Sequence, residues 1–514
     1  MDSSMILNIA AFGLYLLVIL LIGAYFSRRA NTSSADYFIG GRGLGPWVAA
    51  MSAEASDMSG WLLMGLPGVA YWCGLSDAVW TAIGLAIGTY LNWLLVSKRL
   101  RRYSERAGDA ITIPDFFSNR FKEKTPLLLL LSSLIILIFF SVYVGSTFVT
   151  GGKLFNSLFN ADYHLMLLIT VFFVLAYTLM GGFWAESFSD LIQAVIMIIA
   201  LLAVLIFGVI SAGGLGAIFN NIGQIPGFVD FFGIASPTVE NGAQTVVNNT
   251  PQFGAAGSYG LLTILSTMSW GLGYFGMPQV LLRFIAIRDI KELDRSRRIA
   301  VIWCVISLFA AVLIGLMGRA MFPVSLLTSS ASENIFILLS QTLFHPLFAG
   351  LVMAGILAAA MSSSDSYLLI AASAVSKNIY QNILKKEASD KDVMRASRVT
   401  LLVIALIGFI IAWDENSVIF TVVSFAWAGF GAAFGPLMLF SLFWKRCTRA
   451  GAVAGILGGG GMVFIWKLLI KPLGGVFGIY ELLPAFLFAC ICIVVVSLLT
   501  EEPSAEIQRE FEAI

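Results

Sequence analysis

Long apolar runs follow one another along almost the whole chain, separated by short polar breaks. Thirteen of them come near or exceed the length of about 20 residues that a helix needs to cross a bilayer. They are numbered here in chain order and lie near 5–27, 45–72, 76–97, 126–151, 163–181, 186–210, 258–283, 299–322, 346–376, 396–413, 417–443, 450–470 and 479–499. Their continuous apolar character predicts membrane-spanning helices, because the strands of a membrane barrel would alternate.

The composition supports a protein embedded in a lipid bilayer. Of the 514 residues, 59% are hydrophobic and only 12% are charged, too few charges to cover the surface of a soluble protein of this size. No stretch has the basic character of a nucleic-acid-binding face, so we expect no nucleic acid as a partner. The first apolar run has no basic segment before it, which indicates a retained helix and not a cleaved signal peptide.

Positive residues are concentrated in alternate loops, those that follow the odd-numbered spans. The clearest clusters lie at 98–106, 288–298, 377–398 and 445–449, whereas the longest loop of the other set, 211–257, has no Lys or Arg. Since cytoplasmic loops carry the excess of Lys and Arg, the N-terminus is predicted outside and the acidic tail from Glu501 inside. We expect a multi-pass protein of the cell (plasma or inner) membrane.

Two spans contain residues that an uninterrupted, lipid-facing helix would not carry. Span two has Glu54, Asp57 and Gly60 near its middle, and span seven has a central group of glycines and a proline: Gly271, Gly273, Gly276 and Pro278. Both patterns predict discontinuous helices, whose unwound centres expose backbone groups to ions and solutes. The two spans are five apart, which favours two inverted repeats of five helices. For span seven a glycine-rich packing face is the alternative, and for Asp57 a structural hydrogen bond.

Span nine carries a cluster of side-chain oxygens. On a helix, Ser362, Asp365 and Ser366 stand at i, i+3 and i+4 on one face, with Ser363 beside it. Hard cations such as sodium prefer several oxygen ligands, so the cluster predicts a cation site. Glu186 and Asp190 lie near the start of span six, where simple solvation is an equal alternative.

Six longer motifs resemble one known family. They are DYFIGGRGLGPW (36–47), SAEASDMSGWLLMGLPG (52–68), TIPDFFSNRF (112–121), WGLGYFGMPQ (270–279), ILAAAMSS (356–363) and FAWAGFGAAFGP (425–436). Together, in order and at family spacing, they resemble the sodium/proline symporter branch of the solute:sodium symporter family, from about residue 10 to residue 505.

The resemblance implies an all-α polytopic membrane protein with a LeuT-like core of two inverted five-helix repeats, in about 13 transmembrane helices. The chain would form one transporter domain, with a leading helix and loop at 5–44, repeats at 45–210 and 258–443, and two trailing helices at 450–499.

The resemblance also implies a principal sodium site. Its ligands would be the backbone carbonyls of Ala55, Met58 and Ala359 and the hydroxyls of Ser362 and Ser363, with the acidic Asp57 nearby. A hydroxyl is kept at Ser363, where the branch commonly has Thr. Asp190, Asp365 and Ser366, with Ser362, match a second sodium site of some relatives. The number of sodium ions carried, one or two, therefore remains open. Glu54, at a position where a small residue is more usual, has no explanation from the sequence.

A substrate pocket is implied around the two broken helices. Its residues would be Ser59, Gly60, Trp61, Tyr143, Trp270, Tyr274 and Pro278. Aromatic faces suit the pyrrolidine ring of proline, and a broken helix end can present N–H groups to its carboxylate. Arg42 of the GGR motif would act in gating and coupling on the cytoplasmic side.

The function that these residues imply is sodium-coupled import of L-proline by alternating access, with Na⁺ as the coupling ion. The same machinery with another amino acid, pantothenate or a sugar acid is the main alternative. A membrane sensor that binds solute without transport is disfavoured by the short tail after residue 500. No nucleophile–base constellation indicates an enzyme.

Overall fold

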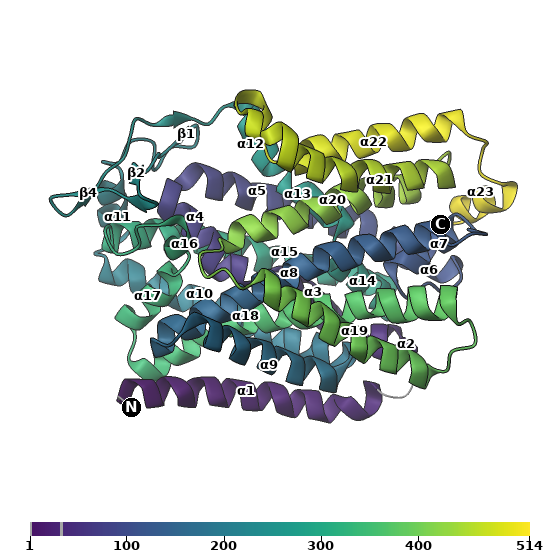
Figure 1. Cartoon of the computed structure of the whole chain (residues 1–514), viewed down its shortest axis with the longest axis horizontal. Helices are drawn as coiled ribbons and strands as arrows, with labels where there is room; N and C mark the ends of the chain where they lie inside the picture. The colour runs from purple at the N-terminus through teal and green to yellow at the C-terminus, as the bar shows by residue number, and fades with distance from the viewer. Residues whose placement is uncertain (1–2, 31–33) are drawn as a thin grey trace.

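The computed structural model describes residues 3–30 and 34–514 and consists mostly of helices (Figure 1). Residues 31–33, in the loop predicted after the leading helix, lie outside these ranges. Many of the long helices run roughly along the horizontal axis of Figure 1. This arrangement suits apolar helices that cross a bilayer side by side.

The first half of the chain forms helices of very different length. They are α1 (Ser3–Ala30), α2 (Ser34–Ile39), η1 (Gly40–Arg42), α3 (Pro46–Asp57), η2 (Trp61–Gly65), α4 (Leu66–Cys73), α5 (Leu75–Leu91), η3 (Asn92–Val96), α6 (Ser97–Arg106), α7 (Ile113–Arg120), α8 (Leu127–Phe159), α9 (Tyr163–Gly181), α10 (Phe183–Ser211) and α11 (Leu215–Ile222).

The segment between α11 and α12 holds the strands. Three short antiparallel pairs form there: β1 (Gly233–Ile234) with β6 (Gly257–Ser258), β2 (Val239–Glu240) with β3 (Ala243–Gln244), and β4 (Val246–Val247) with β5 (Thr250–Pro251). Except for Ser258, these strands lie in the long loop 211–257, which has no Lys or Arg. Figure 1 places them at the end of the molecule opposite α23.

The second half of the chain is again helical. Its helices are α12 (Leu261–Met268), α13 (Trp270–Gly273), η4 (Tyr274–Gly276), α14 (Pro278–Ala286), η5 (Ile290–Glu292), α15 (Leu293–Met321), α16 (Ser329–Ser332), α17 (Ile335–Leu343), α18 (Pro346–Ser373), η6 (Ala374–Leu384), α19 (Asp390–Ile411), α20 (Ile419–Phe443), α21 (Arg449–Ile465), η7 (Trp466–Ile470), η8 (Lys471–Leu473), η9 (Gly475–Gly478), α22 (Leu482–Leu499) and α23 (Ala505–Glu512).

Helices fall on all thirteen predicted spans, but two of the spans are not single helices. Within the described ranges, ten helical runs are long and apolar enough to cross a membrane, and Trp61–Cys73 and Tyr163–Leu179 are shorter apolar helices. Span two is divided between α3 and η2–α4, and span seven between α12–η4 and α14. Both predicted breaks are therefore confirmed, whereas the total of thirteen spans stays a prediction.

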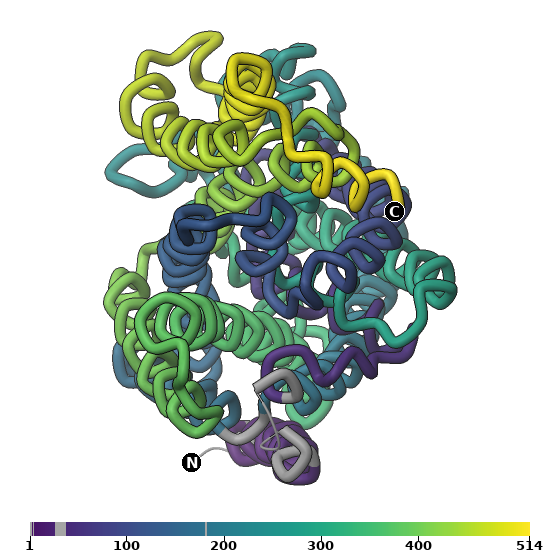
Figure 2. Tube along the Cα trace, turned by 90° about the vertical axis from the view of Figure 1, so that its right-hand side faces the viewer, coloured from purple at the N-terminus to yellow at the C-terminus, as the bar shows by residue number. Residues whose placement is uncertain are grey.

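The helices pack in two groups with connecting helices between them. The broken span two, α5, the broken span seven and α15 pack against one another, and α8, α9, α18 and α19 form the second group. Helices α10 and α20 contact both groups. Figures 1 and 2 show α1 on one flank of the molecule and α21 with α22 on the opposite flank.

Several helices begin where a side chain can accept a backbone N–H of the first turn. Thr112, Asp162, Ser389 and Thr448 cap α7, α9, α19 and α21 in this way. Such caps satisfy N–H groups that have no partner within the helix. The polar breaks between apolar runs thus fix where the helices start.

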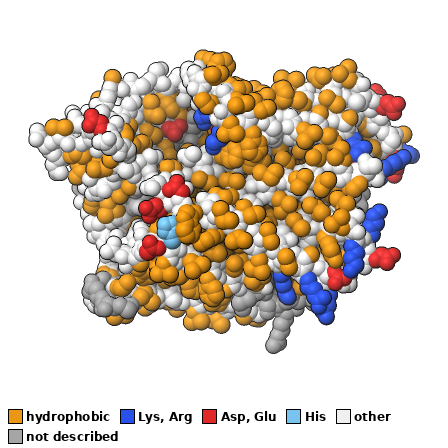
Figure 3. All heavy atoms as spheres, in the orientation of Figure 1, with side chains coloured by type: hydrophobic (Ala, Val, Ile, Leu, Met, Phe, Trp, Pro, Cys, Tyr) orange, Lys and Arg blue, Asp and Glu red, His pale blue; other side chains and the backbone are white. Residues whose placement is uncertain are grey.

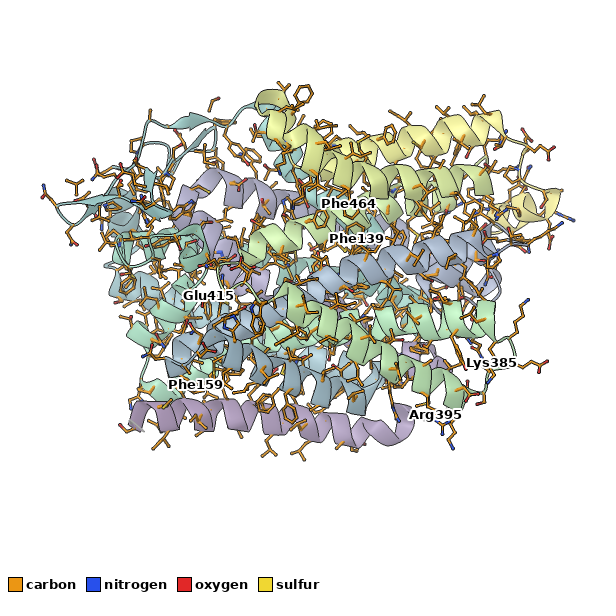
Figure 4. The ribbon with its side chains drawn as sticks, viewed as in Figure 1. Phe139, Phe159, Lys385, Arg395, Glu415 and Phe464 are labelled. Carbon is orange, nitrogen blue, oxygen red and sulfur yellow. The ribbon has the colours of Figure 1, made fainter. Side chains whose placement is uncertain are left out.

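On the face seen in Figure 3, charged side chains lie mainly toward the two ends of the helix bundle. In Figure 3 most of the Lys and Arg side chains on the visible face gather at the right-hand end, and several acidic ones lie toward the left. Figure 4 shows the same division, with Lys385 and Arg395 at one end and Glu415 toward the other. The apolar surface between the ends suits contact with lipid.

Candidate functional site

The break in span two frees a backbone carbonyl at the centre of the molecule. Helix α3 ends at Asp57, and the N–H of Ser59 donates to the Asp57 carbonyl (2.9 Å). In a continuous α-helix this N–H would donate to the carbonyl of Ala55. The Ala55 oxygen is therefore available for other partners.

Gly60 lets the broken helix approach α8 closely. A Cβ atom at Gly60 would lie only 2.2 Å from Oγ1 of Thr150 on α8, so no larger residue fits without movement of that helix. The resulting close approach brings the broken helix against the second helix group.

Two serines of span nine meet the freed carbonyl. Oγ of Ser362 donates to the Ala55 oxygen at 2.8 Å and Oγ of Ser363 at 3.3 Å. The Ser362 hydroxyl also lies 3.2 Å from the carbonyl oxygen of Ala359. Four of the five predicted sodium ligands are thus brought together. Met58, the fifth residue, is buried immediately after α3 with non-helical backbone angles (φ −80°, ψ 70°).

This group of oxygens matches the chemistry of sodium. All its members are neutral carbonyls or hydroxyls, which bind a hard cation while leaving it free to depart. When an ion is bound, the two hydroxyl hydrogens would turn away from the Ala55 oxygen. The residues present therefore fit a sodium ion between α3 and α18.

Asp57 lies next to these ligands and contacts the second broken helix. Its Oδ1 accepts a hydrogen bond from Nε2 of Gln279 (3.2 Å), and its backbone oxygen accepts one from Nε1 of Trp61 (3.1 Å). Its Oδ2 has no hydrogen-bond partner among the described residues. Asp57 thus joins spans two and seven. The sequence prediction missed Gln279, although an amide inside an apolar span is itself a signal.

The residues of the predicted second cation site gather around a buried arginine that was not predicted. Nη2 of Arg283 lies 3.3 Å from Oδ2 of Asp190 and 2.9 Å from Oγ of Ser366, and it also pairs with Glu186. Asp365 instead accepts the backbone N–H of Ser366 (2.8 Å). Arg283 is fully buried, so the acidic residues of this cluster pair with a guanidinium that solvent does not reach.

Glu186 is not a solvated end-of-helix residue. Its side chain is buried and paired with Arg283, so the alternative of simple solvation is wrong. Ser52 of span two completes the cluster, because its Oγ donates to Asp190 (2.7 Å) and accepts from Nε of Arg283 (2.9 Å). The cluster therefore connects spans two, six, seven and nine. An arginine at the end of span seven with apolar residues on both sides was the signal that could have identified it.

Aromatic side chains surround the two helix breaks. The rings of Trp61 and Trp270 lie 6.2 Å apart, and the ring of Tyr274 meets that of Trp427 edge-on at 5.0 Å. On the other side, Tyr143 of α8 lies 4.8 Å from the ring of Tyr367.

Several buried hydroxyls in this region have no hydrogen-bond partner among the described residues. They belong to Ser59, Tyr143, Tyr274 and Tyr367. Unpaired buried hydroxyls are costly, and a polar solute could pair with them. The combination of aromatic faces and unpaired hydroxyls suits a small solute that is partly apolar and partly polar.

Pro278 is placed differently from the other predicted pocket residues. It begins α14, after Met277 in an extended conformation, and it lines a cavity of about 10 Å³ with residues that include Phe38, Ile113 and Leu369.

The glycines of span seven also serve close packing: a Cβ at Gly273 would meet Trp427 at 2.0 Å and one at Gly276 would meet Phe430 at 2.3 Å. Span seven is therefore both broken and closely packed through its glycines.

Arg42 joins several segments at the end of the molecule that carries the basic loops. Its guanidinium donates to Asp109 (2.7 Å), to Ser104 (3.1 Å) and to the backbone oxygens of Ala110 and Ile285 (both 3.0 Å). Burial lowers the pKa of this guanidinium, and Asp109 opposes that effect. Arg42 therefore connects the loop before α3 with α6, its following loop and α14.

The comparisons with known proteins agree with this geometry. Residues 37–459 match the model of the Sodium:solute symporter family. A sodium/proline symporter of Staphylococcus aureus (strain USA300 / TCH1516) is 41% identical over 506 residues, which cover 97% of this chain and 94% of that protein.

Two solved transporters share the fold. A Na⁺-coupled sialic acid symporter in a substrate-bound outward-open state aligns with a TM-score of 0.77 at 20% identity, covering 97% of this chain and 99% of that one. Mhp1, a nucleobase-cation-symport-1 family transporter in a closed conformation, aligns with a TM-score of 0.57 at 12% identity, covering 94% and 99%. At these identities the likeness is one of fold.

Proposed function

Because the chain belongs to the sodium:solute symporter family, we propose that it imports L-proline together with Na⁺ by alternating access. Membership makes it a multi-pass membrane transporter and not an enzyme. Proline is the favoured cargo because the sodium/proline symporter of S. aureus is similar over almost the whole chain. Another amino acid, pantothenate or a sugar acid remains the alternative cargo.

The contact of the Ala55 carbonyl with Ser362 and Ser363 carries this proposal. It joins the broken span two to span nine, which belong to different helix groups. A sodium ion held by both groups would stabilise one arrangement of them, in which the adjacent pocket is complete. Sodium then raises the affinity for proline, and proline raises the affinity for sodium by the same factor.

The rest of the architecture follows the same proposal. Thirteen spans with the N-terminus outside and the C-terminus in the cytoplasm would place repeats at 45–210 and 258–443, a leading helix with its loop at 5–44 and trailing helices at 450–499. One positive charge moving inward across 100 mV supplies about 2.3 kcal/mol, and the sodium gradient adds to it. Together they can concentrate proline inside the cell.

The pocket is proposed to lie between the helix breaks. Trp61, Trp270 and Tyr274 would shelter the pyrrolidine ring, and the chain at Ser59 and Gly60 would face the carboxylate, with Tyr143 opposite. Arg42 would hold the cytoplasmic side closed until the ion and the solute are bound. The polar cluster around Arg283 would hold several spans together, whether or not a second sodium ion binds there. Its other proposed members are Asp190, Asp365 and Ser366.

The test is uptake of labelled L-proline into proteoliposomes with an inward sodium gradient, an inward potassium gradient or no gradient. We expect accumulation above equilibrium with sodium only, and competition by unlabelled proline but not by pantothenate or a sugar acid. If intact protein accumulates pantothenate or a sugar acid and not proline, that solute replaces proline as the proposed cargo. Intact protein that accumulates no solute under any gradient would overturn the proposal.

A further inference from the structure

One residue of the trailing part of the chain stacks directly on a wall of the proposed substrate pocket. Tyr480 lies in the connection between η9 and α22, outside both proposed repeats. Its ring stacks on the indole of Trp270, with centroids 5.2 Å apart and planes inclined by 23°. Trp270 is itself almost fully buried.

Tyr480 is held in this place from two sides. Its hydroxyl donates to the backbone oxygen of Ser424 on α20 (2.6 Å), and its backbone N–H donates to Oγ of Ser266 on α12 (2.7 Å). One residue therefore connects the first half of span seven with span eleven.

The neighbouring residue anchors the connection. The Glu481 side chain is buried and pairs with Lys471 at 3.0 Å and with Lys467 at 3.5 Å. Lys467 in turn lies over the ring of Phe425 on α20, 4.4 Å from its centroid. A buried, paired carboxylate next to Tyr480 limits how far the loop can move without breaking these contacts.

Beneath Tyr480 the aromatic contacts lead to the helix break of span two. Trp270 contacts Phe420 at 5.1 Å and Trp427 at 5.8 Å, and its other neighbour is Trp61 at 6.2 Å. Nε1 of Trp427 donates to the Trp270 carbonyl at 2.8 Å. The order from the loop inward is Tyr480, Trp270, Trp61.

We propose that Tyr480 is a positioning residue of the outer gate, which holds the Trp270 indole across the substrate pocket. This inference rests on the proposed function, because it takes Trp270 as a wall of the proline pocket. Opening toward the outside requires Trp270 to move away, and the stacked Tyr480 ring opposes that movement. The trailing helices thereby control how long a bound solute stays.

The test compares purified Tyr480→Ala, Tyr480→Leu and Tyr480→Phe by the rate at which labelled proline dissociates at saturating sodium. Loss of an aromatic pair should speed dissociation by about three- to tenfold in the Ala and Leu variants. Tyr480→Phe keeps the ring and should stay within about twofold of the unchanged protein. The rise in melting temperature caused by sodium alone should be the same in all of them.

Two further variants separate the possible failures. Phe477→Ala alters the same connection at an exposed ring that contacts Trp466, and it should dissociate proline at the original rate. Trp270→Ala tests the pocket itself. If Trp270→Ala weakens proline binding while Tyr480→Ala and Tyr480→Leu release proline at the original rate, the gate inference is overturned and the pocket stands. If Trp270→Ala binds proline normally, the pocket assignment fails.

Discussion

The ammonium group of Lys153 lies 2.9 Å from Oε2 of Glu333, and both side chains are buried. Lys153 also donates to the backbone oxygen of Ser417 (2.7 Å), and the Glu333 carboxylate accepts the backbone N–H groups of Ile419 and Phe420 (2.9 and 3.0 Å). The pair therefore joins α8, the loop before α17 and the start of α20, next to an aromatic neighbour of Trp270.

Removal of one partner from this pair should be strongly destabilising. Lys153→Met leaves the Glu333 charge buried without its cation, and we expect a loss of about 3–5 kcal/mol in the free energy of unfolding. The double variant Lys153→Met, Glu333→Gln should regain part of that loss because the charge is gone. Unfolding in detergent micelles measures both.

The control is an exposed pair. Lys445→Met breaks the Lys445–Glu512 pair, whose side chains are 44% and 59% exposed, and it should cost less than about 1 kcal/mol. Equal losses from Lys153→Met and Lys445→Met would contradict the importance of burial here.

Neighbouring serines of span nine should differ sharply in sodium dependence. Ser362→Ala removes a hydroxyl that lies at the Ala55 carbonyl, so half-maximal proline uptake should require about tenfold more sodium, equivalent to about 1.4 kcal/mol. Ser364 is the matched control, because its hydroxyl donates to Ala360 of its own helix (2.7 Å). Ser364→Ala should leave the sodium requirement unchanged, and the reverse order would remove Ser362 from the site.

Broken helices could be predicted from the sequence because their cause is local. Gly60 beside Glu54 and Asp57, and four Gly or Pro residues in span seven, are incompatible with uninterrupted lipid-facing helices wherever the chain folds. The structure confirms both breaks. The serines of span nine could be grouped by helical spacing alone, and their contact with Ala55 agrees with the predicted sodium site, which stays a prediction until ions are measured.

The missed residues depend on contacts between distant parts of the chain. Lys153 stands near the end of an apolar run, where lysine side chains commonly reach solvent, and Glu333 lies 180 positions away. Only the packing of α8 against the start of α20 buries them together. The hydrogen-bond partners of Arg283 likewise come from two other spans: Glu186, Asp190 and Ser366. Spacing within one helix holds no information on such partners.

Substitution of Tyr274 should weaken proline binding without weakening sodium binding. Its hydroxyl is buried close to Asp57 and makes no hydrogen bond of ordinary geometry with the described residues, so Tyr274→Phe removes a group with which a bound solute can pair. We expect a three- to tenfold weaker affinity for proline, or about 0.5–1.5 kcal/mol, by equilibrium binding. The stabilisation given by sodium alone should not change.

Tyr163→Phe serves as the comparison for this substitution. The Tyr163 hydroxyl donates to the Ala412 carbonyl (2.8 Å), away from the helix breaks, so its loss should lower stability without changing proline affinity. A Tyr274→Phe variant whose sodium response falls while proline binding stays intact would contradict the pocket assignment.

Asp115 should make the stability of the protein depend on pH. It lies in α7, where its Oδ1 accepts hydrogen bonds from Asn378 (2.7 Å) and Asn382 (3.2 Å) of η6. Burial raises the pKa of this carboxyl from 3.8 to about 6, against the opposing effects of Thr112 and Lys377. The folded protein therefore holds the proton more tightly than the unfolded chain does.

The sign of the effect follows from that difference. The contribution of Asp115 is fully present below pH 3.8 and is lost as the pH rises through about 6, with a total of up to about 3 kcal/mol. Asp115→Asn cannot titrate, so the unfolding free energy of the original protein, measured relative to this variant, should fall between pH 4 and pH 7. Ser133→Ala, which removes a hydroxyl that donates to the backbone oxygen of Leu129 (2.7 Å), should shift stability by the same amount at every pH. A relative stability of the original protein over Asp115→Asn that stays flat or rises across this range would show that the buried carboxyl is not protonated in the folded state.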